Sequence, residues 1–541
     1  MTEFAGHPYV VEEFTAAERA ILLRYFTNVD RPVFALRNLP EIVKGALFAR
    51  YSRTPKSLRR LFLDEFYRGE TVADPGEIGA QRAAELYDRI FIEFGDDSVA
   101  QLGGAHLAVE QGSNVLTKQL EWGRLAAYLE QSTRYVPYDD KPGGRYRYYR
   151  EPDVMAGPHA AAYTATLDAI FAAYAAAVPE AIAGYERRFP KQAEDTAFVY
   201  RSTIRAKALD ALRGMLPAAT VSNSGVYATG QSFEQMLLRM RASPLAEVRS
   251  VAEMMLAELN EVIPVFLQRV DEPARGGVWT EYLASTRAST AAATAEALAG
   301  FTSEPRPLVT LTDWDHEGEE KMLAAMLYAT SDLPDDALRE RVRTMTAEDR
   351  LRLARAYAGE RGNRRHRPGR ALERTGYRFD VLADYGAFRD LQRHRMLTIE
   401  WQDLTPRHGF EMHRDVEELG LGSRFRECMD RSAELWEMLA DQGPQAQYAV
   451  CMAYRIRFVM QLSAREALHL IELRSSPQGH PAYRAVAHEM HRQIAEVAGH
   501  RIVAGMMRFV DTSDVDLERL EAERRAERKR VAAADRAGRR G

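Results

Sequence analysis

Two fragments of a single motif occur far apart in this chain, and this internal repetition constrains the fold more than any other feature. The first fragment, QLEWGRLAAYLEQSTRY, runs from Gln119 to Tyr135, and the second, LQRHRMLTIEWQDL, runs from Leu391 to Leu404. An earlier pair of segments, at residues 32–52 and 307–331, each combines a short β-prone run, a turn and a helical pattern. The same order of segments in both halves predicts two homologous domains in one polypeptide.

The repetition divides the chain into four regions. We expect a first repeat over residues 1–275, a connector over 276–304, a second repeat over 305–512 and a charged helix or tail over 513–541. The connector contains the run STAAATAEALAG, which is rich enough in alanine to predict a helix.

Helical patterns dominate both halves. Apolar residues at the spacing of one helix face occur in each half, at Leu167, Ile170, Phe171 and Tyr174 and at Cys428, Leu435, Trp436 and Leu439. Strand patterns are shorter, for example LAVEQ near Leu107 and YRFDVL near Tyr377. The expected fold class is therefore α+β, helix-rich with short mixed sheets.

Composition narrows the class of protein. The chain has 541 residues, of which 46% are hydrophobic and 28% charged, as in ordinary globular proteins. Its formal net charge of -5 argues against a large nucleic-acid footprint. Two cysteines are too few for a disulfide framework and favour a reducing cytoplasm. We expect neither secretion nor membrane insertion, because the start lacks a basic region followed by an apolar run and no stretch of about 20 apolar residues is present.

The two fragments together resemble the signature of the flavin-dependent thymidylate synthases, RHRxxSxNExSxR. The first fragment keeps the back half of this signature as Glu130, Ser132 and Arg134. Trp122 and Gly123 stand at the positions of its first Arg and its His. The first half of the chain therefore resembles the family only on one side of the motif.

The second fragment keeps the front half of the same signature. Arg393, His394 and Arg395 form its RHR triplet, and Thr398 stands for the Ser. The back half is replaced, with Glu400, Trp401, Asp403 and Thr405 at the positions of Asn, Glu, Ser and Arg.

Two further segments resemble the family pattern in only one half each. ALRGMLP is similar to the ARxxLP segment and keeps its arginine as Arg213, whereas the second half has Gln447 there. The segment from Ser463 to Arg484 is similar to NxRxLxHFLxLRTxPxAQxEIR and matches it at Arg465, His469 and Arg474. In the first half, Gln231 and Gln235 stand at the Arg and His positions.

This complementary survival implies one composite site per chain. In the family, one subunit is expected to supply the RHR triplet with the NxR and LR residues, and its neighbour the ExSxR loop with the ARxxLP arginine. The second half of this chain keeps the first set and the first half keeps the second set. The resemblance therefore implies two family-like domains forming a pseudo-dimer, and a homodimer of the fused chain that forms a pseudo-tetramer.

The resemblance also implies a reaction and its participants. The chain is expected to methylate dUMP to dTMP with methylenetetrahydrofolate and reduced FAD, with NADPH as the reductant and the protein supplying position and charge. The implied catalytic residues are Arg393, His394 and Arg395, which are also expected to bind the flavin with Arg465 and His469. The implied dUMP-binding residues are Glu130, Gln131, Ser132, Arg134, Arg213 and Arg474.

Some positions depart from the family pattern. Asp390 stands where a Gln precedes the RHR triplet, and an acidic group beside a phosphate site is unfavourable. The upstream flavin-binding segment HxSPFEH is only faintly present, in Asp97–Gly104 and in Arg367–Glu373. The alternative hypothesis is a catalytically inactive family member that acts as a nucleotide- or flavin-binding, regulatory or structural protein.

Other kinds of site are not expected. The 13 histidines show no paired metal-ligand spacing, so we expect no metal. The arginine-rich run from Arg361 to Arg370 is more typical of a solvated loop than of nucleic-acid binding in a chain of negative net charge. Cys428 and Cys451 lie in apolar patterns and are expected to be core residues rather than nucleophiles.

Overall fold

The computed structural model describes residues 2–4, 7–9, 11–51, 56–67, 101–193 and 195–513, together with a few positions after Ser513. The chain forms two compact units. Unit 1 comprises Met1–Glu110, Leu125–Glu130 and Asn223–Gly300, and unit 2 comprises Gln111–Arg124, Gln131–Ser222 and Phe301–Gly541. The four-region division expected from the sequence remains a prediction, and most of its last region lies outside the described residues.

The strands form three small sheets. β1 (Thr2–Phe4) pairs with β2 (His7–Tyr9). A three-stranded sheet has the order β3-β5-β4, and its strands are β3 (Gly104–Ser113), β4 (Ala126–Glu130) and β5 (Val221–Thr229). A four-stranded sheet has the order β6-β7-β9-β8, and its strands are β6 (Val309–Trp314), β7 (Gly376–Asp384), β8 (Leu397–Trp401) and β9 (Arg455–Ser463). Every pair with a described register is antiparallel, so the expectation of mixed sheets is wrong for these pairs.

The two larger sheets share one element order. The order β3-β5-β4 in the first half matches β7-β9-β8 in the second, and the middle strand of each comes last in the sequence. In both halves a helix follows the first and the last of these strands, and each helix begins at a side-chain N-cap. The caps are Ser113 for α5 (Asn114–Leu120), Thr229 for α9 (Gly230–Arg241), Asp384 for α16 (Tyr385–Leu391) and Ser463 for α19 (Ala464–Arg474). This correspondence supports two copies of one fold.

The halves differ in the segments that precede these sheets. In the second half, residues 307–331 contain β6 and then α13 (Gly318–Tyr328), as expected. In the first half, the β-prone run after Pro32 makes only an isolated bridge, between Phe26 and Leu36, before α2 (Glu41–Tyr51).

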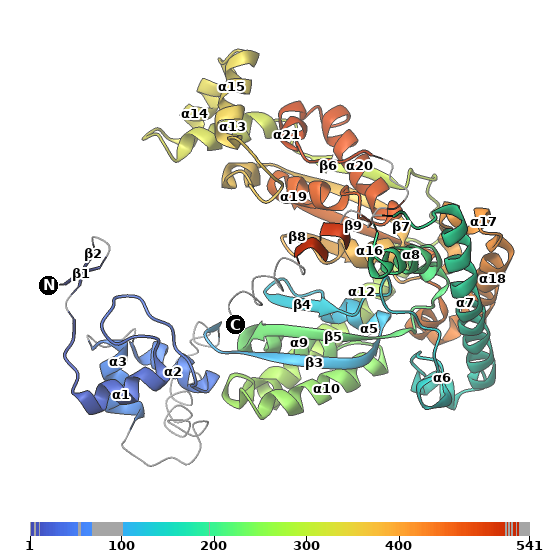
Figure 1. The fold of residues 1–541 in the computed structure, drawn as a ribbon, viewed down its shortest axis with the longest axis horizontal. Coiled ribbons are helices and arrows are strands. Elements are labelled where there is room, and N and C mark those ends of the chain that lie inside the picture. Colours follow the sequence, from blue (N-terminus) through green and yellow to red (C-terminus); the bar gives the residue numbers. More distant parts are fainter. Residues whose placement is uncertain are drawn as a thin grey trace. The chain divides into compact units, whose positions relative to one another are not determined.

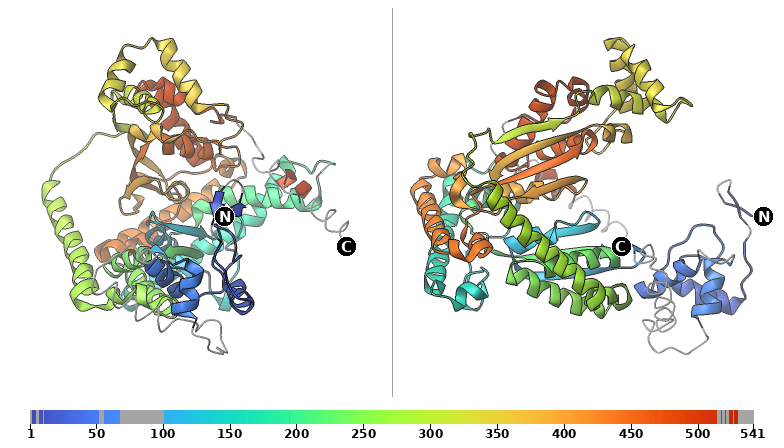
Figure 2. Two further views of the ribbon diagram at one scale, coloured as in Figure 1. Left: turned by 90° about the vertical axis from the view of Figure 1, so that its left-hand side faces the viewer. Right: turned by 180° about the vertical axis from the view of Figure 1, so that it is seen from behind.

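Among the remaining described helices of unit 1, the connector helix α12 is the longest. These helices are α1 (Ala16–Tyr25), α3 (Leu58–Leu61), α10 (Ala246–Asn260), α11 (Gln268–Asp271) and α12 (Val278–Ala297). The helical prediction for the connector is confirmed by α12, a long single rod (Figure 2). None of its side chains, all of which are described, is buried.

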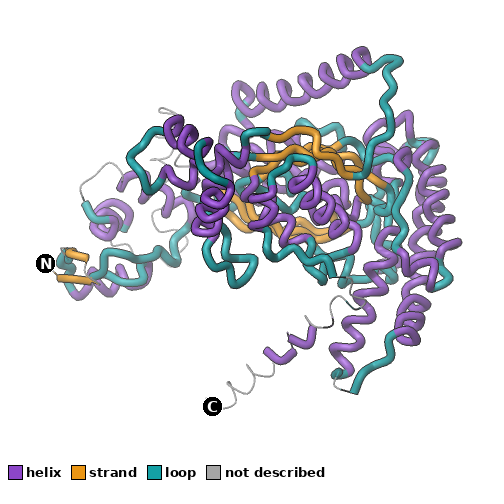
Figure 3. Tube along the Cα trace, turned by 90° about the horizontal axis from the view of Figure 1, so that it is seen from above, coloured by secondary structure: helices purple, strands orange, loops and turns teal. Residues whose placement is uncertain are grey.

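Helices make up most of the described chain (Figure 3), and those of unit 2 enclose its core. The remaining ones are α6 (Pro152–Ala156), α7 (Ala160–Arg188), α8 (Ala197–Leu212), α14 (Asp335–Arg343), α15 (Ala347–Ala358), α17 (Arg414–Glu418), α18 (Gly422–Met438), α20 (Pro481–Glu496) and α21 (Arg501–Met506). α7 packs against α8 and α18, and α19 and α20 cover the four-stranded sheet (Figure 1).

The helix faces predicted in both halves are confirmed. Leu167, Ile170, Phe171 and Tyr174 are fully buried on α7. The second set is buried on and just after α18. These two faces belong to helices that contact each other, so the same apolar pattern contributes to one core from both halves.

α7 bears on the expectation that the chain does not insert into a membrane. Among the described residues it is the one helix long and apolar enough to span a bilayer, with a mean hydropathy of 1.3 over its best window. A core helix has the same composition, and the buried aromatic and aliphatic face of α7 accounts for that apolarity by packing. Its presence is weak evidence for a membrane span.

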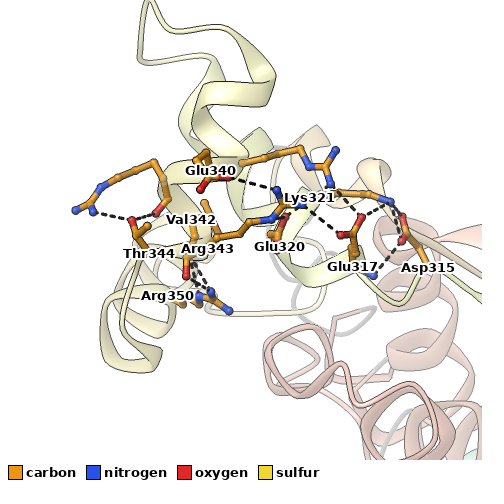
Figure 4. Close-up of polar contacts among 11 residues, drawn as sticks. Asp315, Glu317, Glu320, Lys321, Glu340, Val342, Arg343, Thr344 and Arg350 are labelled. Carbon is orange, nitrogen blue, oxygen red and sulfur yellow. Dashed lines mark hydrogen bonds and ion pairs between the residues drawn. The ribbon is translucent and has the colours of Figure 1, made fainter.

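Ion pairs attach α14 to α13 (Figure 4). Arg343 pairs with Glu317 at 3.2 Å and with Glu320 at 2.9 Å, while Lys321 binds Asp315 at 2.7 Å. Arg350 donates to the carbonyl oxygen of Val342, which ties α15 to the end of α14. These contacts hold a small helical layer beside the β6 end of the four-stranded sheet.

Candidate functional site

The motif residues from both halves lie at the ends of elements in unit 2. Arg134 follows β4, and Arg213 directly follows the last turn of α8. Arg393 follows α16, and Arg474 is the last residue of α19. Side chains at element ends project beyond the packed layers, which allows these four to converge. We call them the arginine cluster.

Asp390 lies at the centre of the arginine cluster. One of its carboxylate oxygens is 3.3 Å from Nη1 of Arg213. The other is 3.8 Å from Arg393 and 4.0 Å from Arg474. Burial acts to raise the pKa of Asp390, but the guanidinium groups, Arg213 first among them, hold it well below its usual value. The carboxylate is therefore a fixed negative charge in a positive site.

Arg134 is held by a second carboxylate. Its Nε and Nη2 atoms bind the two oxygens of Asp210 at 2.5 and 2.6 Å, a bidentate pair. Its Nη1 contacts the hydroxyl of Tyr483 at 3.2 Å, and Nη2 donates to the carbonyl of Gln478. Arg474 lies over the ring of the same tyrosine, 5.4 Å from its centroid. Tyr483 thus joins arginines from the two halves.

Burial opposes the charge on Arg134, but Asp210 raises its pKa well above the usual value. This arginine is charged at every physiological pH. The side chain is only 12% exposed, so its orientation is set before any ligand arrives.

The loop that carries Ser132 follows the strand β4. The hydroxyl of Ser132 accepts a hydrogen bond from the backbone N–H of Arg134 at 3.2 Å, and the carbonyl of Gln131 accepts one from Ser222. Glu130 ends β4 and is buried, and it belongs to unit 1, whereas the other candidate residues belong to unit 2.

His394 is fixed by two neighbours from α19. Its Nε2 accepts a hydrogen bond from Nε of Arg474 at 3.0 Å, which places the ring proton on Nδ1, 2.8 Å from Glu466. Burial, reinforced by Arg474, lowers the pKa of His394 well below its usual value. The ring is therefore neutral, and its tautomer follows from this hydrogen-bond network.

One group of side chains has the geometry of a metal site. Ligand atoms of His394, Glu466 and His469 lie within 4.8 Å of one another. However, both ring nitrogens of His394 are already engaged, and Nε2 of His469 lies 3.2 Å from Arg367. Two guanidinium groups beside the cluster oppose a divalent cation by Coulomb repulsion. These contacts favour a structural role for the three side chains over metal binding.

A larger polar cavity is lined by one of the residues expected to bind flavin. This cavity of about 690 Å³ opens on one end of the four-stranded sheet. Arg395 lines it, together with three more arginines, Arg124, Arg374 and Arg378. Arg465 does not line it but binds Glu373, which does, at 3.1 Å. The four arginines suit phosphate groups, whereas three carboxylates that also line the cavity, those of Asp313, Asp315 and Glu373, offset most of this positive charge.

The remaining flavin candidates lie closer to the arginine cluster. His469 is half-buried one helical turn after Arg465, and its ring centroid is 5.3 Å from that of His394. Burial lowers the pKa of His469 to about 4, so it is neutral at pH 7. Arg393, His394 and His469 are not among the residues that line the 690 Å³ cavity.

Where a motif residue is absent, the side chain at that position makes contacts within the protein. The indole of Trp122, which stands at the first RHR arginine, donates to the carbonyl of Ile399 at 3.3 Å and meets the ring of Trp401 edge-on at 6.3 Å. Gln447, at the position equivalent to Arg213, accepts from the backbone of Leu404 and donates to Asp403. Only one of the two composite arrangements thus retains converging arginines in the part of the chain that the structure describes.

Sequence reasoning missed the residues that hold the arginines in place. Asp210 holds Arg134 from 76 positions along the chain, and Glu466 holds His394 from 72 positions away. Neither contact follows from a local spacing in the sequence. Tyr483 had no local signal either, because its contacts depend on how α20 packs.

Two other candidates have structural explanations. Arg361, the first arginine of the Arg361–Arg370 run, forms a fully buried bidentate pair with Glu472 at 2.7 and 2.5 Å. Both cysteines are buried, and burial raises the pKa of Cys428 to about 12 and that of Cys451 further. The expectation that both cysteines are core residues is confirmed by this burial.

Comparison with known proteins gives full-length relatives. UPF0159 proteins of Chlamydia muridarum and Chlamydia pneumoniae are each 38% identical to this chain, and each alignment covers 95% of this chain and 98% of the relative. A UPF0159 protein of Thermoplasma acidophilum is 32% identical over 89% of this chain and 98% of its own length. Each of these alignments therefore extends over most of both halves of the chain.

A solved structure is similar to part of this chain. The structure of a UMP/dUMP methylase PolB from Streptomyces cacaoi bound with 5-Br dUMP is 17% identical and covers 38% of this chain and 97% of that chain, with a TM-score of 0.28. A TM-score of this size supports no statement about the present fold or function.

The decisive comparison is with a protein family. The family model described as thymidylate synthase complementing protein matches two separate segments, residues 48–265 and 310–499, as a tandem duplication requires. The arginine cluster takes Arg134 and Arg213 from the first matched segment and Arg393 and Arg474 from the second. This chain belongs to the thymidylate synthase complementing protein family, that of the flavin-dependent thymidylate synthases.

Proposed function

We propose that this protein methylates dUMP to dTMP at one composite site per chain, with methylenetetrahydrofolate as the carbon donor and FAD reduced by NADPH. The observation that carries the proposal is the convergence on Asp390 of Arg213 from the first family segment and of Arg393 and Arg474 from the second. Family membership supplies the reaction class.

The charge of the site suits a nucleotide phosphate. The four arginines of the cluster face Asp210 and Asp390, so the formal sum is 4 − 2 = +2. Asp384 lies beside Arg213 and reduces this sum to +1 when it is ionised. A phosphate monoester carries about −1.5 to −2 charges at pH 7, so its charge is opposite in sign to this excess. Binding the phosphate would offset the positive charge of the site.

Each motif residue has a distinct task in this proposal. Arg134, Arg213 and the loop of Gln131 and Ser132 hold the phosphate of dUMP. Arg474 and the neutral His394 face the base, where the guanidinium donates and fixes the orientation of the imidazole. Glu130 supports the loop from β4. Position and charge are what the protein adds to the reaction.

In this proposal the flavin lies at the 690 Å³ cavity and would supply the hydride that completes the methyl group. Arg395, which lines this cavity, Arg465, which binds Glu373 on it, and His469, which lies next to His394, are the residues that would hold the flavin. A homodimer of the fused chain and a cytoplasmic location belong to the same proposal, and light scattering of the purified protein tests the dimer.

A second candidate function has one observation in its favour. Arg134 and Arg213 already bind carboxylates, so a phosphate must compete with Asp210 and Asp390. A family member with this internal neutralisation can survive as a nucleotide- or flavin-binding protein without turnover.

Two measurements separate the candidates. A purified protein with flavin absorbance that restores growth of a thymidine auxotroph supports the enzyme. A colourless protein that cannot be reconstituted with FAD, and that fails to complement at normal expression, supports the inactive member. The Arg393→Ala variant is the control. If it fails to complement, the growth restored by the unchanged protein depends on this site and is not an indirect effect of expression.

A further inference from the structure

A loop beside His469 carries three arginines that have no task in the proposed reaction. The loop joins α15 to the segment before β7, and its cationic side chains are those of Arg364, Arg365 and Arg367. We call them the loop arginines. Arg364 is half-buried and the other two are exposed. None of the three lines the 690 Å³ cavity.

The loop is held in shape by its own hydrogen bonds. The carbonyl of His366 accepts from Nε of Arg361 at 2.6 Å, and the backbone N–H of His366 donates to the carbonyl of Asn363 at 3.1 Å. The side chain of Asn363 accepts from the backbone N–H of Arg365 at 2.9 Å. Arg361 is itself fixed by its buried pair with Glu472. The loop arginines therefore extend from an ordered support.

Two of the loop arginines act on His469. Nη2 of Arg367 lies 3.2 Å from Nε2 of His469, and the ring nitrogen is the acceptor because a guanidinium can only donate. Burial lowers the pKa of His469 to about 4, and Arg367 and Arg364 act in the same direction. The ring centroid of His469 is 5.3 Å from that of His394, the histidine proposed to face the base of dUMP. The loop arginines therefore lie next to the proposed reaction centre.

The positive charge of the loop arginines is not neutralised by an ion pair. Among the residues that the structure describes, no carboxylate lies within 4.0 Å of any of the three. The nearby carboxylates have other partners, because Glu466 binds His394 at 2.8 Å and Glu373 binds Arg370 at 3.0 Å and Arg465 at 3.1 Å. A guanidinium pairs well with a carboxylate or a phosphate. The loop arginines are thus available to an anionic part of a ligand.

The proposed reaction has one anionic participant without a partner in the protein. The phosphate of dUMP is assigned to the arginine cluster and the flavin to the 690 Å³ cavity. Methylenetetrahydrofolate must bring its carbon to the same base, and it ends in glutamate carboxylates. We propose that the loop arginines bind the glutamyl carboxylates of this folate. This inference rests on the proposed function and adds to it a site for the folate tail.

The test compares two forms of the folate on the full chain in the presence of dUMP and oxidised FAD, so that no turnover occurs. Methylenetetrahydropteroate has the same ring system without glutamate, whereas methylenetetrahydrofolate triglutamate carries several carboxylates. One exposed ion pair is weak, but several on one tail act together, so calorimetry at low salt should show about tenfold tighter binding of the triglutamate form. At about 1 M salt most of this gain should disappear through screening. Equal affinity of the two forms at low salt overturns the inference.

A double variant assigns the gain to the loop. Arg364→Gln combined with Arg365→Gln removes two of the three charges and leaves the contact between Arg367 and His469 in place. It should bind the triglutamate form as weakly as the pteroate form, and its affinity for the pteroate form should be unchanged. Arg352→Gln, at a side chain of α15 that is 76% exposed, is the matched control and should keep the full gain. A full gain in the double variant, or an equal loss for both forms, overturns the assignment.

Two further measurements separate the carboxylates of folate from the phosphates of the other participants. The affinity for FAD and the preference for NADPH over NADH should be the same in the double variant as in the unchanged protein. A change of about tenfold in either would assign the loop arginines to a phosphate and overturn the inference. Binding of the pteroate form without any gain from glutamate overturns this inference alone. No binding of either form overturns the folate-dependent reaction together with it.

Discussion

The carboxylate of Asp390 lies 3.3 Å from the guanidinium of Arg213, and this ion pair joins the two family segments within unit 2. Both side chains are buried, at 8% and 4% exposure. Desolvating two charges costs about as much as their attraction returns, so a buried pair of this kind says more about specificity than about stability. Here it fixes the geometry of the proposed phosphate site and at the same time competes with the phosphate for Arg213.

Removing the charge of Asp390 should therefore strengthen nucleotide binding. In Asp390→Asn, Arg213, Arg393 and Arg474 lose a competing anion, and we expect dUMP affinity to increase about tenfold, the effect of about 1.4 kcal/mol. Isothermal titration calorimetry at low salt measures this directly. Asp332→Asn, at an exposed position, should leave the affinity unchanged. Unchanged or weaker binding in Asp390→Asn, in a folded variant, would show that Asp390 does not compete with the phosphate.

Loss of an arginine from either half should weaken binding to a similar extent. Arg134→Ala and Arg393→Ala are each expected to cost about 1.5 to 3 kcal/mol of dUMP binding, the range of a lost charge-assisted hydrogen bond. Because Arg134→Ala removes the bidentate partner of Asp210, the double change with Asp210→Asn separates stability from binding. Arg352→Ala, at a side chain that is 76% exposed, is the control. If only one of the two halves contributes, the composite site is refuted.

Stability should fall as the pH rises through the titration of Asp384. Burial raises the pKa of Asp384 from 3.8 to about 6, although Arg213 opposes this. The native state therefore binds more protons than the unfolded state between about pH 4 and 6, and the free energy of unfolding decreases across this window by up to about 3 kcal/mol. Asp384→Asn should remove that loss and stabilise the protein at pH 7 but not at pH 4. Urea unfolding at both pH values measures the difference, and equal effects at the two would contradict the assignment.

The buried pair of Arg361 and Glu472 should contribute strongly to stability when only one partner is removed. Its side chains are 1% and 0% exposed, so Glu472→Ala leaves a buried unpaired guanidinium and should cost about 3 to 5 kcal/mol. The exposed pair of Arg352 and Asp349 is the matched control, and Asp349→Ala at this helix should cost about 1 kcal/mol or less, including its contact with Thr346. Chemical denaturation compares the two variants. Similar costs for both would indicate that the Arg361–Glu472 pair is more hydrated than its burial implies.

Motif comparison identified the arginines because their positions in the pattern follow from the sequence alone. It could not identify what holds them, since Tyr483 and Gln478 reach Arg134 only through the packing of α20 beside α8. Pattern reasoning about long helices, such as α7, succeeded because the apolar period is strong over many residues.

Short elements were less predictable for a physical reason. The runs after Pro32 and Pro307 are both β-prone, but only the second pairs with a neighbouring strand, β7. Strand formation depends on a partner and on the face that becomes buried. The strand before the loop of Ser132 depends on a partner in the same way, because AAYLE becomes β4 by pairing with β5.

The presence of Arg134, Arg213, Arg393 and Arg474 within one unit of a single chain has a genetic consequence. When a pocket is shared between identical subunits, two differently damaged proteins can restore each other in mixed oligomers. Here the arginines from both segments meet in the same polypeptide. Co-expression of an Arg134 variant with an Arg474 variant should therefore not restore activity. The two variants should fail to complement each other, because each polypeptide contains a complete but damaged set of the four arginines.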